Sequence, residues 1–221
     1  MEILAIIPAR KGSKGIKNKN LRKVGGVPLV ERAVHAALAS DVTRIVVSTD
    51  CPKTRELLRD YRSSYAIDIV ERPETLAGDY ASVEDVERHV IDEVGAPDMI
   101  VRLFSTCPFR DPHDINACVS IAKDAGAGAV VSVTDPTHYP SQDVDISGRA
   151  ITHADEDWRH PRQHWRRRRI VNGAVYVAFV DYWNEHGYFG PQTIAYEMPR
   201  ERSLDIDTPF DLKMARALCD M

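Results

Sequence analysis

The sequence predicts an α/β fold with a mostly parallel sheet flanked by helices. Short continuous apolar runs recur along the first 133 residues, separated by stretches whose apolar residues recur at three- and four-residue spacing. Continuous apolar runs are typical of buried parallel strands, and the second spacing is typical of amphipathic helices. Strands joined through helices imply right-handed crossovers and a parallel sheet. Ligands of such sheets bind at the carboxyl ends of the strands.

The expected elements follow one another closely in this first part of the chain. The apolar runs predict strands at 3–8, 44–50, 67–72, 98–104 and 128–133. The segments between them predict helices at 28–40, 52–59, 82–94 and 112–124. Pro28 stands near the first helical position, where proline is favoured because its missing N–H has no intrahelical partner there.

The character of the sequence changes after Val133. Residues 134–169 contain prolines, two tryptophans, an RRRR run and short alternating pieces, which we interpret as an antiparallel excursion from the main sheet. A further buried strand is expected at 173–180, a short one at TIAYEM and a final helix at 208–221. Residues 1–221 are interpreted as one domain.

Composition excludes several classes of protein. A chain of 221 residues, 43% of them hydrophobic, can bury one substantial core. Its 29 basic and 33 acidic residues give a net charge of −4, so no nucleic-acid partner is expected. The absence of a long apolar run or a leader-like start predicts no membrane contact and a cytoplasmic location. The four scattered cysteines indicate free thiols rather than a zinc site.

A basic, glycine-containing loop follows the first expected strand. ARKGSKGIKNKN places Arg10, Lys14 and Lys19 around Gly12 and Gly15. Glycines let the backbone approach phosphate oxygens, and the cationic side chains supply countercharge. The loop matches neither the Walker A nor the dinucleotide-binding pattern. It therefore indicates a triphosphate site, with a solvated basic loop as the alternative.

Two aspartates near the other end of the chain predict a metal site. Asp205 and Asp207 in RSLDIDTPFD fall on the same face of an extended segment. Two carboxylates so placed can share a hard cation such as Mg²⁺, which also binds substrate phosphates. The alternative is that Asp207 caps the last helix.

Several motifs, taken in order, resemble those of the acylneuraminate cytidylyltransferases. They are IIPARKGSKGIKNKNL, VSTD, ERPETLAGD, NGAVY and SLDIDTPFD, and they run from one end of the chain to the other. The resemblance implies a Rossmann-like nucleotide-diphospho-sugar transferase fold. It also implies a homodimer that exchanges an extended arm, and residues 134–170 stand where that arm is expected.

The resemblance assigns roles at matching positions. Arg10 and Lys14 match contacts to the β- and γ-phosphates, whereas Lys19 and Asn20 match those to the α-phosphate and nucleotide. Arg72 matches a position near the nucleotide. The metal-binding pair is Asp205 and Asp207, for Mg²⁺ with Mn²⁺ as the alternative. Lys19, Asp207 and Arg10 are the expected catalytic residues.

The expected sugar site departs from the family pattern. Where members that use common sialic acids carry a QPTSP-like motif, this chain has FSTCPFR, so Phe104 replaces a glutamine that contacts the sugar. Asn172 matches a position beside the sugar. Arg162 aligns with a family arginine, but the following residues have lost a proline and gained charge. The run 166–169 is interpreted either as a binding site for an acidic substrate or as a solvated or inter-subunit face.

These observations predict a magnesium-dependent cytidylyltransferase that converts CTP and an acidic nonulosonic-type sugar, such as a sialic acid, to a CMP-sugar and pyrophosphate. One alternative keeps the fold but changes the acceptor to 3-deoxy-octulosonic acid or a phosphonate. Another is a non-catalytic nucleotide-binding regulatory protein. The preference for cytosine follows from the resemblance alone.

Overall fold

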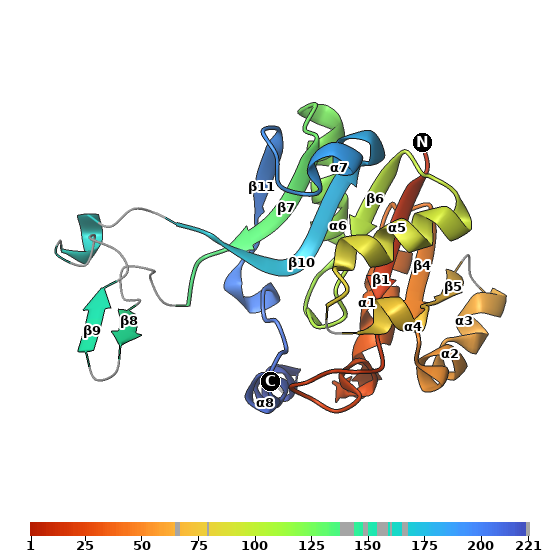
Figure 1. The fold of residues 1–221 in the computed structure, drawn as a ribbon, viewed down its shortest axis with the longest axis horizontal. Helices are drawn as coiled ribbons and strands as arrows, with labels where there is room; N and C mark the ends of the chain where they lie inside the picture. The colour runs from red at the N-terminus through yellow and green to blue at the C-terminus, as the bar shows by residue number, and fades with distance from the viewer. Residues whose placement is uncertain are drawn as a thin grey trace.

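The computed structural model describes residues 1–64, 67–78, 80–137, 144–147, 150–153, 159, 161–164 and 168–219. Its centre is a seven-stranded sheet with the strand order β11-β7-β10-β6-β1-β4-β5 (Figure 1). The strands are β1 Ile3–Pro8, β4 Arg44–Thr49, β5 Ile67–Glu71, β6 Met99–Arg102, β7 Ala129–Thr134, β10 Ile170–Phe179 and β11 Thr193–Glu197. The expected mostly parallel α/β sheet is confirmed.

One central strand runs against the others. β10 pairs antiparallel with β6 on one side and β7 on the other, whereas the remaining pairs are parallel. The amino-terminal end of β10 therefore lies at the same edge of the sheet as the carboxyl ends of β1 and β6. This reversal brings Asn172 and Gly173 to the edge where ligands of such sheets bind.

The helices begin and end close to the expected positions. They are α1 Leu29–Leu38, α2 Pro52–Leu57, α3 Arg59–Ser64, α4 Glu74–Ala77, α5 Val83–Val94, α6 Pro112–Asp124, α7 Val180–His186 and α8 Pro209–Cys219. Ser82 and Asp111 form capping boxes that start α5 and α6, satisfying backbone N–H groups that lack helical partners. The helix expected at 52–59 is interrupted at Leu58, and α4 and α7 were not expected.

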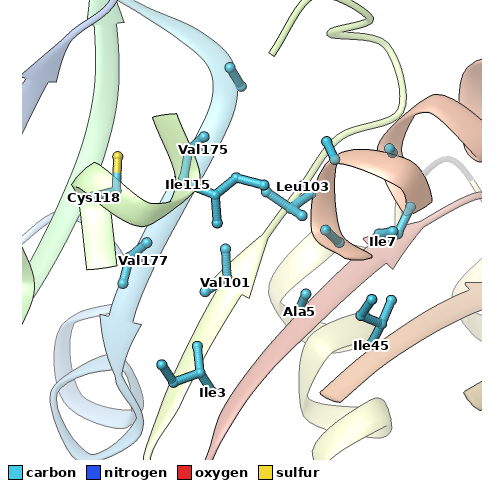
Figure 2. Close-up of a cluster of buried hydrophobic side chains, with 14 of the residues drawn as sticks. Ile3, Ala5, Ile7, Ile45, Val101, Leu103, Ile115, Cys118, Val175 and Val177 are labelled. Atoms are coloured by element: carbon cyan, nitrogen blue, oxygen red, sulfur yellow. The ribbon is translucent and has the colours of Figure 1, made fainter. Parts of the chain in front are cut away.

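Helices cover both faces of the sheet and bury its alternating side chains. Along β1, Ile3, Ala5 and Ile7 face a cluster with side chains of α1 and α6, part of which is shown in Figure 2. Leu4 and Ile6 face the opposite cluster, which includes side chains of α5 and α7. Burying each such large aliphatic side chain stabilises the fold by about 1.5–3 kcal/mol.

Two small hairpins lie outside the main sheet. β2 (Lys23–Val24) and β3 (Val27–Pro28) form one of them, after the short 3-10 helix η1 (Lys19–Leu21). β8 (Val144–Ser147) and β9 (Ala150–His153) form the other, which stands apart from the sheet in Figure 1. The second hairpin agrees with the expected antiparallel excursion. Two further 3-10 turns are η4 (Arg162–His164) and η5 (Arg200–Arg202).

In the part of the chain that the structure describes, no helix has both the length and the apolar character needed to cross a membrane.

Candidate functional site

A cavity of about 420 Å³ opens where the loops after β1 and β6 meet. From β1 the chain crosses to β4 on one side, whereas β6 pairs with β1 on the other. A crevice at such a change of direction is the usual ligand site of an open α/β sheet. The cavity is lined by Pro8, Arg10, Ser13, Lys14, Gly15, Lys19, Asn20, Arg72, Val83, Phe104, Ser105, Thr106 and Asp207.

The loop after β1 is held by hydrogen bonds at both ends. The Lys11 N–H donates to Asp50 Oδ1 at 2.7 Å. The Asn20 amide donates to the Arg10 carbonyl at 2.8 Å and accepts from Ser105 Oγ at 2.6 Å. Asn20 is buried, so its amide fixes the base of the loop against the loop after β6. The structure thus gives Asn20 a supporting contact in addition to its place in the cavity lining.

The basic loop and the aspartate segment meet through Lys19. Its ammonium donates to Asp207 Oδ1 and to the Ile206 carbonyl, both at 2.9 Å. The Lys19 side chain is 15% exposed and that of Asp207 is 71% exposed. A mostly buried lysine therefore holds a solvent-exposed carboxylate that lines the cavity.

Gly15 permits a close approach of the loop to the same segment. A Cβ atom added at Gly15 would collide with the backbone carbonyl of Asp207, whereas one added at Gly12 would have no neighbour within 4 Å. Only a residue without a side chain fits at position 15. Gly15 thereby lets the basic loop pack directly against the backbone of the aspartate segment.

Arg72 is a buried cation in the lining of the cavity. It donates from Nε to Ser48 Oγ at 3.3 Å and from Nη2 to the Ser48 carbonyl at 3.1 Å. Burial lowers the pKa of Arg72 to about 10, so the guanidinium stays charged at neutral pH. A fixed, partly desolvated positive charge of this kind favours a phosphate-bearing ligand.

Of the two aspartates expected to hold a metal, Asp207 lines the cavity and Asp205 does not. Burial raises the pKa of the Asp205 carboxyl, and the negative charge of Asp207 raises it further, so a nearby cation would stabilise both carboxylates. Among the residues that the structure describes, no three acidic, histidine or cysteine side chains form a metal cluster. Two carboxylates near a loop suited to phosphate are typical of sites for Mg²⁺, which takes its other ligands from water and substrate.

The start of α8 is capped by residues other than Asp207. The Asp211 N–H donates to Thr208 Oγ1, and Asp211 Oδ2 accepts from the N–H groups of Asp207 and Thr208. Thr208 and Asp211 satisfy the helix start. The carboxylate of Asp207 pairs with Lys19 instead, so the alternative role of Asp207 as a cap is not what the structure shows.

Asn172 lies beside the site but points into the protein. Its Oδ1 accepts from Ser132 Oγ at 2.6 Å, and its Nδ2 donates to Ser203 Oγ at 2.8 Å. Asn172 is 5% exposed and does not line the cavity. Because Ser203 precedes Asp205 by two residues, this amide ties β7 and β10 to the aspartate segment.

Gly173 shapes the irregularity in β10 at this point. Its φ is +75°, a conformation that glycine adopts readily, and the register of β10 against β7 shifts between Val171 and Tyr176. A Cβ atom on Gly173 would lie 3.6 Å from Asp205 Oδ2 and 3.8 Å from Phe104 Cδ2. Phe104 and Asp205 thus border the same small space.

The loop after β6 rests on a buried arginine. Arg110 donates from Nη1 to the Phe104 carbonyl at 3.1 Å and to the Ala174 carbonyl of β10. Burial lowers the pKa of Arg110 to about 10. In the same loop, burial raises the pKa of the Cys107 thiol to about 12, which removes the thiolate a nucleophile would require.

The cavity lining also contains residues that the sequence did not indicate, namely Ser13, Val83, Ser105 and Thr106. Ser105 and Thr106 follow directly after an expected strand, and that position could have indicated them. Ser13 lies within the basic loop itself. The place of Val83 depends on how α5 packs.

The predicted arginines of the arm are described only in part. The side chain of Arg162 and residues 166 and 167 lie outside the described residues. Arg169 forms ion pairs with Asp135 at 2.8 Å and Glu197 at 2.9 Å. For Arg169, the structure therefore shows a contact within the chain.

The chain is similar to known cytidylyltransferases. A family profile described as cytidylyltransferase matches residues 4–220. The N-acylneuraminate cytidylyltransferase of Escherichia coli O18:K1:H7 is 34% identical over 225 residues, covering 97% of this chain and 51% of the relative. The CMP-N,N'-diacetyllegionaminic acid synthase of Legionella pneumophila is 32% identical over 235 residues, covering 100% of this chain and 97% of that relative. The chain thus spans about half the length of the first relative.

Solved structures show the same fold. A CMP:2-keto-3-deoxy-manno-octonic acid synthetase complexed with CTP has a TM-score of 0.74 at 19% identity, covering 100% of this chain and 99% of that one. A 4-diphosphocytidyl-2C-methyl-D-erythritol synthase from Anaerococcus prevotii has a TM-score of 0.69 at 12% identity, covering 100% and 96%. The expected Rossmann-like nucleotide-diphospho-sugar transferase fold is confirmed. As the resemblance to the acylneuraminate cytidylyltransferases implied, the chain belongs to the cytidylyltransferase family.

Proposed function

We propose that the protein transfers a cytidylyl group from CTP to a hydroxyl group of an acidic, nonulosonic-type sugar and releases pyrophosphate. The observation that carries this proposal is the contact of Lys19 with Asp207, which joins the basic, glycine-containing loop to the aspartate segment. The relatives named above act on N-acylneuraminate and N,N'-diacetyllegionaminic acid by their names.

The loop after β1 is suited to hold the triphosphate. Arg10 and Lys14 line the cavity and would bind the β- and γ-phosphates. Lys19, Asn20 and Arg72 would bind the α-phosphate and the nucleotide. These cations neutralise the charge that grows on the leaving pyrophosphate, which is the main stabilisation that phosphoryl-type transfer needs from a protein.

In the proposed reaction no side chain of the protein forms a covalent bond to the substrate. The acceptor oxygen would form a bond to the α-phosphorus in line with the departing pyrophosphate, whose bond to that phosphorus breaks. The hydroxyl proton leaves to water or to Asp207. Asp205 and Asp207 would hold Mg²⁺ or Mn²⁺, which when bound neutralises charge on the phosphate oxygens. Lys19 keeps the Asp207 carboxylate oriented toward the cavity.

We further propose that the chain acts as a homodimer through residues 134–170 and resides in the cytoplasm. Ile170 and Val171, the first two residues of β10, are exposed apolar residues next to this segment, as an intermolecular contact would require. The four cysteines are free thiols, as in a reducing compartment. Sedimentation velocity of the chain and of a variant lacking residues 138–166 would test this proposal. We expect the full chain to sediment as a dimer and the shortened variant to sediment as a monomer.

The test of the activity is pyrophosphate release with Mg²⁺ and each nucleoside triphosphate. The acceptors are N-acetylneuraminic acid, N,N'-diacetyllegionaminic acid, 3-deoxy-octulosonic acid and a small phosphonate. We expect release with CTP and a nonulosonic acid, and loss of release in Asp207→Ala. Release with only the octulosonic acid or the phosphonate would reassign the acceptor. CTP binding without release would favour the regulatory alternative.

A further inference from the structure

A buried ionic cluster, absent from the motifs discussed above, lies behind Phe104. Arg102, the last residue of β6, is 5% exposed, and Glu87 of α5 is completely buried. Arg102 donates from Nε to Glu87 Oε1 at 2.7 Å and from Nη2 to Glu87 Oε2 at 2.7 Å. It also donates from Nη2 to Glu84 Oε1 at 2.6 Å. Two neighbouring turns of α5 thus hold one guanidinium.

The same guanidinium packs against three aromatic rings. Its Cζ atom lies 5.6 Å from the ring centroid of Phe104, 5.1 Å from that of Tyr176 and 4.5 Å from that of Tyr188. The Phe104 and Tyr176 rings meet edge to face at 5.8 Å. Cation–π and edge-to-face contacts have a preferred geometry. Arg102 therefore fixes the position of Phe104, whose ring lines the cavity.

The cluster offers no attraction for an anion. One arginine faces two glutamates, and the Tyr188 hydroxyl donates to Glu87 Oε1 at 3.0 Å. Burial acts to lower the pKa of Arg102, but the bonds to Glu87 outweigh it and raise that pKa, so the cation persists. The carboxylate of an acidic sugar is thereby directed to the basic side of the cavity, away from Phe104.

Phe104 lies close to one of the aspartates that the proposed function assigns to the metal. Phe104 and Asp205 border the space over Gly173, so a group that approaches a phosphate held near the aspartates passes beside the phenylalanine ring. Val83 is another apolar residue of the cavity lining. Neither side chain can form a hydrogen bond with a sugar hydroxyl. The wall that they form is apolar.

From this arrangement we infer that Phe104, held by Arg102, forms an apolar acceptor subsite that favours a sugar acid with a deoxy or methyl group there over one with a hydroxyl group. The inference rests on the proposed function. An apolar wall rejects an added hydroxyl only modestly, by up to about 100-fold in kcat/KM. Arg102 is a positioning residue in this subsite, since it contacts Phe104 rather than the sugar.

The test compares N-acetylneuraminic acid with its monodeoxy derivatives at C4, C7, C8 and C9, using CTP and Mg²⁺. For the unaltered protein we expect one deoxy derivative to exceed the parent sugar in kcat/KM by about 10- to 100-fold. Phe104→Gln should remove or reverse this preference, because an amide can bind the hydroxyl. Phe104→Leu, the matched control, should keep it. A parent sugar that is the best substrate, or an unchanged ratio in Phe104→Gln, would overturn the inference.

The role of Arg102 is tested with Arg102→Lys, which keeps the charge but loses the planar fork that holds two carboxylates. We expect KM for the preferred deoxy sugar to rise several-fold while the dissociation constant of CTP stays the same. In Glu84→Gln, which alters a partly exposed partner of Arg102, KM for the same sugar should rise by a smaller factor. A change confined to kcat, or equal losses for CTP and sugar, would contradict the positioning role.

A separate measurement distinguishes failure of the subsite from failure of the proposed function. If no sugar gives pyrophosphate, binding is measured instead. The same sugars are titrated calorimetrically into protein saturated with a non-hydrolysable CTP analogue, which shows whether the subsite exists without the reaction. Tighter binding of one deoxy derivative, lost in Phe104→Gln, would retain the subsite and reject the transfer reaction. Equal binding or no binding would reject the subsite as well.

Discussion

The ammonium group of Lys19 lies 2.9 Å from Asp207 Oδ1, although 188 residues separate the two in the chain. It also binds the Ile206 carbonyl, so one side chain fixes both the backbone and the carboxylate of the aspartate segment. The contact joins the two features that the sequence could only treat separately, a basic loop and an acidic pair.

Replacement of Lys19 is expected to remove most activity. In Lys19→Met, Asp207 loses its partner and the phosphate site loses a preorganised cation. We expect kcat for pyrophosphate release to fall by about 10²- to 10³-fold, the usual effect of removing one such group. Lys17→Met is the control, because Lys17 lies in the same loop but does not line the cavity. Equal losses in both variants would show that only the net charge of the loop matters.

Gly15→Ala should weaken CTP binding at least tenfold. The added methyl group meets the Asp207 carbonyl, so the loop or the aspartate segment must move. Gly12→Ala places its methyl group in open space and should leave the dissociation constant within about twofold, since surface changes away from such features have small effects. Calorimetric titration with CTP measures both. Tight CTP binding by Gly15→Ala would mean that the loop sits elsewhere in solution.

Asn172→Ala should destabilise the fold and lower activity together. The substitution removes the acceptor of the buried Ala174 N–H and the donor to Ser203 Oγ, whereas the Ser132 hydroxyl keeps its bonds to Val175. An unsatisfied buried polar group costs about 1–3 kcal/mol, which urea unfolding would detect. Asn184→Ala on α7 is the control, because Asn184 is exposed. If Asn172→Ala raised KM for the sugar without loss of stability, the amide would contact substrate directly.

Cys107 is expected to be chemically inert in the folded protein. Because burial raises its pKa to about 12, only about one thiol in 10⁴ is ionised at pH 8. Iodoacetamide should modify Cys107 far more slowly than the partly exposed Cys219, and equally fast after unfolding, as mass spectrometry of the peptides would show. Cys107→Ala should keep kcat within a few-fold. Loss of turnover in that variant would revive a nucleophilic role.

The pair of Arg202 and Asp114 predicts a loss of stability in acid. Burial opposes ionisation of Asp114, but hydrogen bonds from Arg202 outweigh it and lower the pKa of the carboxyl. A carboxyl with a lowered folded pKa stabilises the fold above its unfolded pKa of about 3.9, and the contribution disappears as pH falls through the folded value. Arg202→Met should therefore reduce the free energy of unfolding more at pH 6 than at pH 2–3. A constant difference across this range would contradict the assignment.

The sequence predicts secondary structure best where one hydrophobic pattern extends over a whole helix or strand. β1 and α6 begin and end where expected, because a continuous apolar run defines the strand and a proline and a capping box define the helix. α4 and α7 were missed because four and seven residues are too few for a helical period to be visible. The break between α2 and α3 at Leu58 has no glycine or proline to indicate it.

For the site, the sequence identified residue types but not their contacts. Arg10, Lys14, Lys19, Asn20, Arg72, Phe104 and Asp207 all line the cavity. The inward direction of Asn172 was not predicted, because it depends on the bulge in β10 and on Ser132 and Ser203. The pairing of Arg102 with Glu87 joins a strand to a helix, and neither local spacing nor charge pattern could reveal it.

The distance along the chain between Lys19 and Asp207 has a consequence for biosynthesis. A nascent chain that has emerged only as far as β10 already contains all but one of the strands of the main sheet. It still lacks the segment against which Gly15 and Lys19 rest. Contacts of such long sequence separation form late, because the intervening loop must close first. Competence for ligand binding should thus appear near the end of synthesis, after the sheet has largely assembled.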